Sequence, residues 1–315
     1  MSFAAMMLVA LVLDALIGWP DWLFRRIGHP VTWIGALIGA LDGALNRPRW
    51  STRARVRLGA LTTLVCVSAA LLPMLALHWL LPDGWIGVLL GGLAAWPLVA
   101  ARGLYDHVAA VARPLAAGAI QEARAAVALI VGRDPQRLDR AGIARAALES
   151  LAENASDGVV APIFWGVLLG LPGIAAYKAI NTLDSMIGHR TPRHAAFGYV
   201  AARLDDAANL IPARLTGPLL GLASGRIRRA IGVMRRDARQ HRSPNAGWPE
   251  AAMAGALGVR LSGPRVYADS IADEPWLNAG AADPQPQDLS WGLRIYIRAM
   301  TLLAAALAGL AWALA

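Results

Sequence analysis

The feature that most constrains this chain is a set of five predominantly apolar runs, each long enough to cross a bilayer, for which about 17–25 residues are needed. Backbone polar groups inside lipid must be satisfied within helices or closed barrels. No alternating strand pattern occurs, and the hydrophobic content of 57% exceeds that of a typical soluble protein. The sequence therefore predicts an all-α, polytopic integral membrane protein. The five runs are residues 1–17, 58–81, 85–101, 159–177 and 297–315.

Arginines gather at the ends of these runs, which is the pattern of a membrane protein. Arg47 to Arg57 precede the second run and Arg102 follows the third, so both ends are predicted to be cytoplasmic. We expect a single domain over residues 1–315, with cytoplasm-facing helices and loops at 102–158 and 226–296. The net charge of +9 is not arranged as a basic stripe with interleaved aromatics, which argues against nucleic acid as a partner.

The fourth run contains Leu171-Pro172-Gly173 in its middle, and Pro-Gly is a strong turn signal. We predict that this run is a helical hairpin that returns to the cytoplasmic side. A full crossing would instead separate the polar clusters on its two sides. Residues 207–224 are apolar but interrupted by Pro212 and Pro218, and are predicted to pack against protein rather than lipid.

Carboxylate and amide side chains cluster three times within residues 149–214. Mg²⁺ prefers one or two carboxylates together with water and substrate phosphates, so each cluster is a candidate metal site. Helix N-termini also favour acidic charges, which is the alternative explanation for Glu149, Glu153 and Asp157 and for Asp205 and Asp206. Because ionisable groups near lipid are costly, three such clusters favour function. They comprise Glu149, Glu153, Asn154 and Asp157; Asn181 and Asp184; and Asp205, Asp206 and Asn209.

Lys178 is the only lysine among the 30 Lys and Arg residues, and it lies between acidic clusters. Its compact ammonium on a flexible stem can shift its pKa in a way that a guanidinium cannot. We interpret Lys178 as a catalytic cation. The alternative is a compositional bias towards arginine that left one lysine by chance.

Residues 243–250 form a turn-rich loop before an apolar helix, and Pro249 suits the first helical position. Free N–H groups at a helix N-terminus bind phosphate, and arginines lie just upstream. The alternative is a basic segment that meets anionic lipid headgroups. The sequence has neither a Walker A motif nor histidines at zinc-ligand spacing. The predicted phosphate-binding residues are Arg235, Arg239, His241, Asn245 and Gly247.

These motifs, taken in order, resemble the adenosylcobinamide-phosphate synthase (CobD/CbiB) family of cobalamin biosynthesis. The resemblance covers most of the chain. Trp19 is a departure, since an acidic residue is expected before Pro20. The matching segments are ESLAENASDGVVAPIFW, YKAINTLDSMIGHR, ARLDDAANLIPARL and SPNAGWPEAAMAGALG, with GHPVTWIG at 28–35 and VGRD at 131–134.

The resemblance implies a multi-pass protein of the bacterial inner membrane whose active site faces the cytoplasm. It implies that adenosylcobyric acid is joined to aminopropanol or its O-phosphate as an amide, with ATP as co-substrate and Mg²⁺. Association with other membrane enzymes of corrinoid assembly, and contact with membrane lipids, are also implied. On this interpretation Asp184, Asp205 and Asp206 bind metal, Lys178 and Arg214 stabilise phosphoryl charge, and Glu149 or Glu153 is the base.

Two other classes of function stay open. Asn181-x-x-Asp184 and Asp205-Asp206-x-x-Asn209 are similar to the acid pairs of Mg²⁺-dependent intramembrane transferases that act on prenyl or lipid pyrophosphates. That class gives no role to the loop at 243–250. A transporter or scaffold would bind substrate without turnover, and the inverted repeats common in transporters are not detectable.

Overall fold

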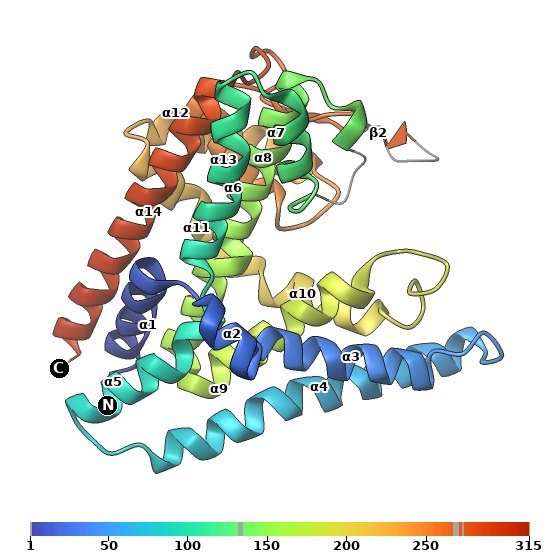
Figure 1. The fold of residues 1–315 in the computed structure, drawn as a ribbon, viewed down its shortest axis with the longest axis vertical. Coiled ribbons are helices and arrows are strands. Elements are labelled where there is room, and N and C mark those ends of the chain that lie inside the picture. The colour runs from blue at the N-terminus through green and yellow to red at the C-terminus, as the bar shows by residue number, and fades with distance from the viewer. Residues whose placement is uncertain (1, 132–134, 267–270, 273, 315) are drawn as a thin grey trace. The chain divides into compact units, whose positions relative to one another are not determined.

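Helices dominate the computed structural model, which describes residues 2–131, 135–266, 271–272 and 274–314 (Figure 1). The all-α prediction is confirmed, and the described strands are only two residues long. The predicted VGRD motif has its Gly132, Arg133 and Asp134 outside the described residues. The strands form two antiparallel pairs, β1 (Leu261–Ser262) with β4 (Trp276–Leu277) and β2 (Arg265–Val266) with β3 (Ile271–Ala272).

The chain divides into two compact units, each built from separate stretches of sequence. Unit 1 comprises residues 1–100, 161–209 and 307–315, and unit 2 comprises residues 101–160 and 210–306. The segments predicted to face the cytoplasm, 102–158 and 226–296, both belong to unit 2. The side of the membrane on which they lie stays a prediction.

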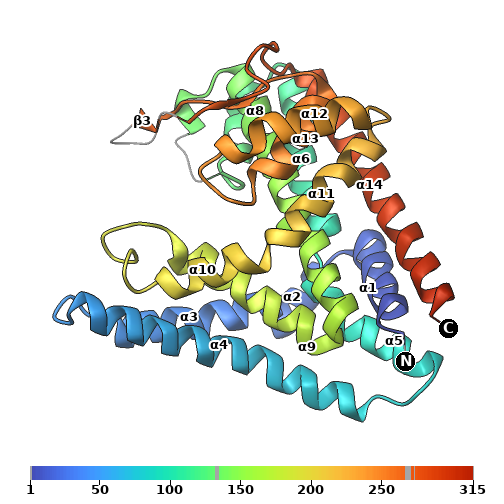
Figure 2. The same ribbon diagram turned by 180° about the vertical axis from the view of Figure 1, so that it is seen from behind.

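Unit 1 is built around two long helices, α3 and α4, which lie side by side (Figures 1 and 2). His29 starts α3 because its Nδ1 accepts the Val31 N–H, while Thr32 completes a capping box. A buried apolar core joins α3 and α4 to α9 and α10. The elements are α1 (Phe3–Ile17), α2 (Asp21–Ile27), α3 (Pro30–Leu45), α4 (Thr52–Leu80), α5 (Trp85–Ala95), η1 (Trp96–Leu98), α9 (Ala161–Leu183), η4 (Asp184–Gly188) and α10 (Tyr199–Ala208).

The chain reverses direction inside α9, at Gly170, where φ is +67° and ψ is −151°. L-residues rarely adopt this conformation, whereas glycine does so readily. The two arms then pack together: Ala161 and Tyr177 share one buried cluster, although 16 residues of straight helix would separate them by about 24 Å. The predicted turn is therefore present, whereas the return of this segment to the cytoplasmic side stays a prediction. The turn lies at Gly170, two residues before Pro172, where it was expected. Pro172 instead lies in the first turn of the returning arm, where its missing N–H is tolerated.

Unit 2 contains a tightly packed group of three helices, α11, α12 and α13. Gly221 and Gly255 both lie directly against Ala230, which lets these helices approach closely. The Tyr296 hydroxyl donates a 2.9 Å hydrogen bond to the Ala101 carbonyl. The elements are α6 (Ala101–Ala116), α7 (Ile120–Val127), η2 (Pro135–Arg137), α8 (Arg140–Ala155), η3 (Ser156–Val160), α11 (Leu210–Ala223), α12 (Ile227–Asp237), η5 (Ala238–Gln240), α13 (Gly247–Leu257) and α14 (Pro286–Ala313), whose last residues belong to unit 1.

Four helical runs among the described residues are long and apolar enough to cross a membrane, or five if one bent pair is counted as a span. The bent pair joins α1 to residues 21–45 at an angle of 111°. The sequence prediction for residues 1–17 was therefore incomplete, because α1 has only 15 residues and needs the apolar helix α3. The four runs are Thr52–Leu80, Trp85–Ala116, Arg140–Gly188 and Pro286–Ala313.

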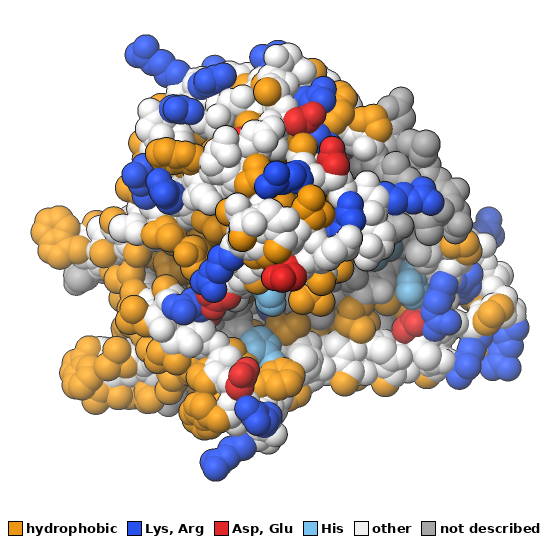
Figure 3. Space-filling view, turned by 45° about the horizontal axis from the view of Figure 1, so that its top comes forward, with side chains coloured by type: hydrophobic (Ala, Val, Ile, Leu, Met, Phe, Trp, Pro, Cys, Tyr) orange, Lys and Arg blue, Asp and Glu red, His pale blue; other side chains and the backbone are white. Residues whose placement is uncertain are grey.

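Large apolar side chains remain exposed along these helices, as a lipid-facing surface requires (Figure 3). In α4, for example, Leu64 is 63% exposed and Leu72 is 57% exposed. Helix α11 has a similar exposed side, formed by Ile211, Leu215 and Leu222. The prediction that residues 207–224 pack against protein is thus right for one face of α11 and wrong for the other.

Candidate functional site

Three acids of unit 1, Asp184, Asp205 and Asp206, meet where η4 follows α9 and lies beside α10. We call Asn181, Asp184, Asp205, Asp206 and Asn209 the Asp205 cluster. Asp205 is 8% exposed, and its Oδ2 accepts a 3.0 Å hydrogen bond from Asn209 Nδ2. The three predicted metal ligands, Asp184, Asp205 and Asp206, act on one another electrostatically. The structure therefore brings together residues that the sequence placed in two separate motifs.

Burial and, to a smaller extent, the neighbouring Asp184 and Asp206 carboxylates raise the pKa of Asp205 to about 7. Hydrogen bonds from Asn209 and Asn181 oppose this shift. Among the described residues, Oδ1 of Asp205 is buried with no hydrogen-bond partner. A buried acceptor without a partner beside two further carboxylates suits a bound cation.

The described residues contain no group of three or more His, Cys, Asp or Glu side chains arranged as a ready-made metal site. Mg²⁺ does not require such a cage, because it usually keeps waters and substrate oxygens in its shell. Asp206 also forms an ion pair with Arg203 at 3.3 Å on the same helix. Asp205 is thus the best-placed ligand, with Asp184 beside it.

Two acidic residues of the predicted site lie in π-helical turns, Asp157 in η3 and Asp184 in η4. Such turns are rare and occur frequently at functional sites. In the sequence, Glu149, Glu153 and Asp157 are four residues apart, which predicts that they share one face of an α-helix. Helix α8 ends at Ala155 and the wider π turn changes the register, so that prediction is wrong for Asp157.

Lys178 lies on the returning arm of α9, at the wall of a cavity of about 380 Å³ within unit 1. The other lining residues come mainly from α3, α4 and α9 and are almost entirely apolar, Trp33, Leu37 and Met74 among them. The Lys178 ammonium is close enough to His29 to act on it electrostatically. The one lysine of the chain therefore borders an apolar space large enough for a ligand.

In unit 2, Glu149 is buried in α8 and its Oε1 accepts a 2.8 Å hydrogen bond from the backbone N–H of Ser262. Ser262 has a φ of +60°, unusual for a residue other than glycine. The Glu149 carboxylate therefore holds this turn in place, a role that the sequence did not indicate. Glu153 is half-buried on the same helix, and the exposed Asn154 donates from Nδ2 to the Ser150 carbonyl at 3.0 Å.

A second polar group of unit 2, the Arg214 group, comprises Arg214, Arg239, Asn245 and Trp248. Arg214 projects from α11, and its Nη1 donates to the Leu210 carbonyl at 2.6 Å and to Asn245 Oδ1 at 3.4 Å. Its guanidinium lies 4.4 Å from the centre of the Trp248 ring. Burial, and then the charge of Arg239, lower the pKa of Arg214. Two nearby guanidinium groups favour an anionic ligand.

The loop before α13 is held by its own hydrogen bonds. His241 is buried, accepts the Ser243 N–H at its Nδ1, and lies 3.7 Å from Glu250 through its Nε2. The Ser243 hydroxyl accepts the N–H groups of Asn245 and Ala246. These amides are therefore not directed at a ligand, contrary to the expected helix N-terminal phosphate site. The guanidinium groups of Arg214 and Arg239 are the better phosphate donors.

Helix α13 begins at Gly247, so Pro249 occupies its third position rather than its first. A Cβ on Gly247 would overlap the Ala238 carbonyl oxygen and the His241 Cβ, so only glycine permits this contact. Gly247 thus has a packing role. It brings the start of α13 against η5, which carries Arg239.

The basic run upstream does not act as one patch. Arg236 pairs with Asp237 at 2.7 Å and Arg242 pairs with Glu274 at 3.4 Å. Arg235 is exposed on α12. Of the predicted arginines in this run, only Arg239 joins the Arg214 group.

Comparison with known proteins gives a consistent result over nearly the whole chain. A "Cobalamin biosynthesis protein CobD" of Rhodobacter capsulatus is 62% identical over 302 residues, covering 95% of each chain. Proteins of the same name from Sinorhizobium fredii and Brucella suis are each 47% identical, over 309 and 315 residues, covering 94–96% of the chains. No solved structure matches the chain. The CobD/Cbib protein family profile matches residues 7–296, and the chain belongs to that family.

Proposed function

We propose that this protein is a membrane-embedded ligase of cobalamin biosynthesis. It joins a carboxylate of adenosylcobyric acid to the amine of aminopropanol, or of aminopropanol O-phosphate, as an amide, with ATP as the energy source. Family membership supports the pathway. The observation that carries the chemistry is the Asp205 cluster, in which a buried carboxylate oxygen without a partner lies beside two more carboxylates.

Amide formation from a carboxylate requires activation of the acid. Transfer of the terminal phosphoryl group of ATP to the carboxylate oxygen gives an acyl phosphate and ADP. The free amine then attacks the carbonyl carbon, the C–N bond forms, and inorganic phosphate leaves with the bonding electrons. The ammonium must lose a proton before the attack, so a general base is needed.

The chain supplies side chains for each role. Asp205, with Asp184 and Asp206, would hold Mg²⁺, which neutralises phosphoryl charge when bound. Lys178 in unit 1 and the Arg214 group in unit 2 supply cations that stabilise phosphate oxygens. Glu149 or Glu153, both on α8, would be the general base, and the Glu149 carboxylate also accepts the Ser262 N–H. His241 and Gly247 position the Arg239 segment rather than contact substrate.

A reconstitution assay tests this proposal. Purified protein in detergent is mixed with adenosylcobyric acid, aminopropanol phosphate, ATP and Mg²⁺, and the amide product is measured by mass spectrometry. We expect product with the wild type and a loss of at least about 100-fold with Asp205→Asn. Asp106→Asn, which breaks an exposed pair with Arg102, is the matched control. Product formation that survives Asp205→Asn unchanged would contradict the assignment.

One observation favours a second candidate, a Mg²⁺-dependent transferase acting on a prenyl or lipid pyrophosphate. The cavity beside Lys178 is apolar, as the tail of such a substrate would require. Incubation with Mg²⁺ and a prenyl pyrophosphate, followed by measurement of released pyrophosphate, separates the two functions. Release of pyrophosphate without amide formation would favour the transferase.

A further inference from the structure

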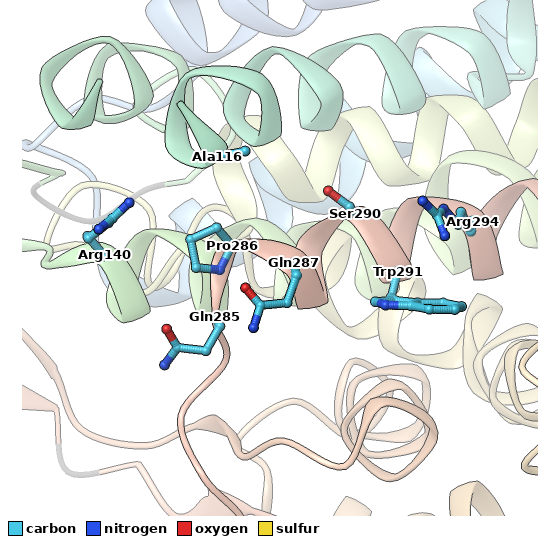
Figure 4. Close-up of a pocket in the computed structure, with 8 residues that line it drawn as sticks. All are labelled: Ala116, Arg140, Gln285, Pro286, Gln287, Ser290, Trp291 and Arg294. Atoms are coloured by element: carbon cyan, nitrogen blue, oxygen red, sulfur yellow. The ribbon is translucent and has the colours of Figure 1, made fainter. Parts of the chain in front are cut away.

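A polar cleft lies in unit 2, away from the side chains assigned above. It has a volume of about 500 Å³ and lies where the end of α6 meets the starts of α8 and α14. In Figure 4, Arg140 lies at one end and Trp291 and Arg294 at the other, with Gln285 and Gln287 between them. The volume falls within the range of small-molecule sites.

Several arginines of unit 2 are held in ion pairs with acids, and the two arginines of the cleft are not so held by any described residue. Arg145 and Arg260 both bind Asp283, and Arg236 binds Asp237. By contrast, no described residue forms an ion pair with Arg140 or Arg294.

The acids nearest to the cleft in sequence are both used as helix caps. Asp139 accepts the Gly142 N–H at 2.7 Å, and Asp288 accepts the Gln285 N–H at 2.8 Å. Neither carboxylate makes an ion pair with a described arginine. The cleft therefore has a guanidinium group without an ion pair to a described residue at each end, and the one at the Arg140 end is available to an anion.

The remaining lining residues suit a planar, polar ligand. Trp291 is 49% exposed, and the Arg294 guanidinium lies 4.9 Å from its ring centre. An exposed indole ring stacks well with a heterocyclic base. Gln285 and Gln287 carry amides that can both donate and accept hydrogen bonds, as the edge of a base or a ribose requires.

We propose that this cleft binds a nucleoside triphosphate, with the base on Trp291 and the phosphates at the Arg140 end. Here the inference rests on the proposed function, because the nucleotide would be its ATP. The Arg214 group is then available for the phosphate of the amino alcohol. A lipid phosphate at the start of α14 shares the same anionic chemistry, so the experiment must separate the two sources.

Binding of a ribose-labelled fluorescent ATP analogue to purified protein in detergent tests the cleft. Loss of a charged hydrogen bond or of base stacking should weaken binding by about tenfold in Arg140→Ala and in Trp291→Leu. Arg228→Ala, an exposed charge on α12, and Trp312→Leu, an exposed ring on α14, are the matched controls, expected within about twofold of the wild type. Thermal unfolding should be the same for all four variants.

Competition identifies the source of the phosphate. Unlabelled ATP should displace the probe completely, whereas detergent-solubilised phosphatidylglycerol should not. Displacement by the lipid alone, or equal binding by Arg140→Ala and the wild type, would overturn the proposal. Weak binding in Arg214→Ala with normal binding in Arg140→Ala would also overturn it. Because binding is read without turnover, absence of amide product with nucleotide binding intact would count against the ligase and not against the cleft.

Discussion

The hydroxyl of Tyr177 donates a 2.8 Å hydrogen bond to Oδ1 of Asn209, and both side chains are buried. Nδ2 of Asn209 in turn donates to Asp205. The returning arm of the α9 hairpin is therefore bonded to the centre of the Asp205 cluster. Within unit 1, the hairpin and the candidate metal ligands are one connected network.

Tyr177→Phe should destabilise this network. The change removes one donor and leaves the buried Asn209 Oδ1 without it, which costs about 1–3 kcal/mol. Thermal unfolding in detergent should show a lower midpoint than for Tyr199→Phe, which removes a hydroxyl from a side chain that is 52% exposed. Equal midpoints would mean that the Tyr177 hydroxyl contributes nothing to stability.

Asp205 should make stability depend on pH. Its pKa is 3.8 when unperturbed and about 7 in the folded chain, so folding takes up a proton between these values. The stabilising contribution is complete below pH 4 and falls as pH rises to about 7, by at most about 1.4 kcal/mol per unit. Unfolding of the wild type from pH 4 to 8 should therefore show a slope that Asp205→Asn reduces. Parallel curves for the two proteins would contradict this.

Gly170→Ala should weaken the hairpin. A residue with a Cβ is strained at φ +67° and ψ −151°, at a cost of about 1–3 kcal/mol. Gly43→Ala is the control, because Gly43 is helical and a Cβ there would meet nothing within 4 Å. The Gly170 variant should unfold at a lower temperature, and the Gly43 variant at an equal or higher one.

Lys178→Arg should reduce amide formation by about 10²–10³-fold while leaving the unfolding midpoint nearly unchanged. Arginine keeps the charge but cannot place a compact donor at the same point. Arg228→Lys, the reverse exchange at an exposed position, should retain normal turnover. Near wild-type turnover in Lys178→Arg would move the catalytic cation to Arg214.

Much of the fold follows from apolar run length, since α4, α5 and the apolar part of α14 lie where expected. The hairpin was also predictable, because Pro172 and Gly173 are turn signals. Helix α3 was not predicted to be part of a membrane span, because it forms a candidate span only together with α1. A hydropathy window along the sequence does not reveal the 111° bend between the two.

The site was predictable in its residue types but less so in its geometry. Asp184, Asp205 and Asn181 meet as expected because α9, η4 and α10, which carry them, pack together in the same unit. The π turns could not be foreseen, since α-helical spacing was assumed throughout. The hydrogen bond from the Ser262 N–H to the Glu149 carboxylate could not be foreseen either, because the two residues are 113 positions apart.

The reversal at Gly170 has a consequence for how many times the chain crosses the bilayer. A segment that leaves a membrane on the side where it entered adds an even number of crossings. Hydropathy alone counts the run from Arg140 to Gly188 as one passage, which is odd. On the predicted topology, in which this segment leaves the membrane on the side where it entered, the backbone conformation of Gly170 sets the number of crossings as odd or even, and with it the side on which later segments emerge.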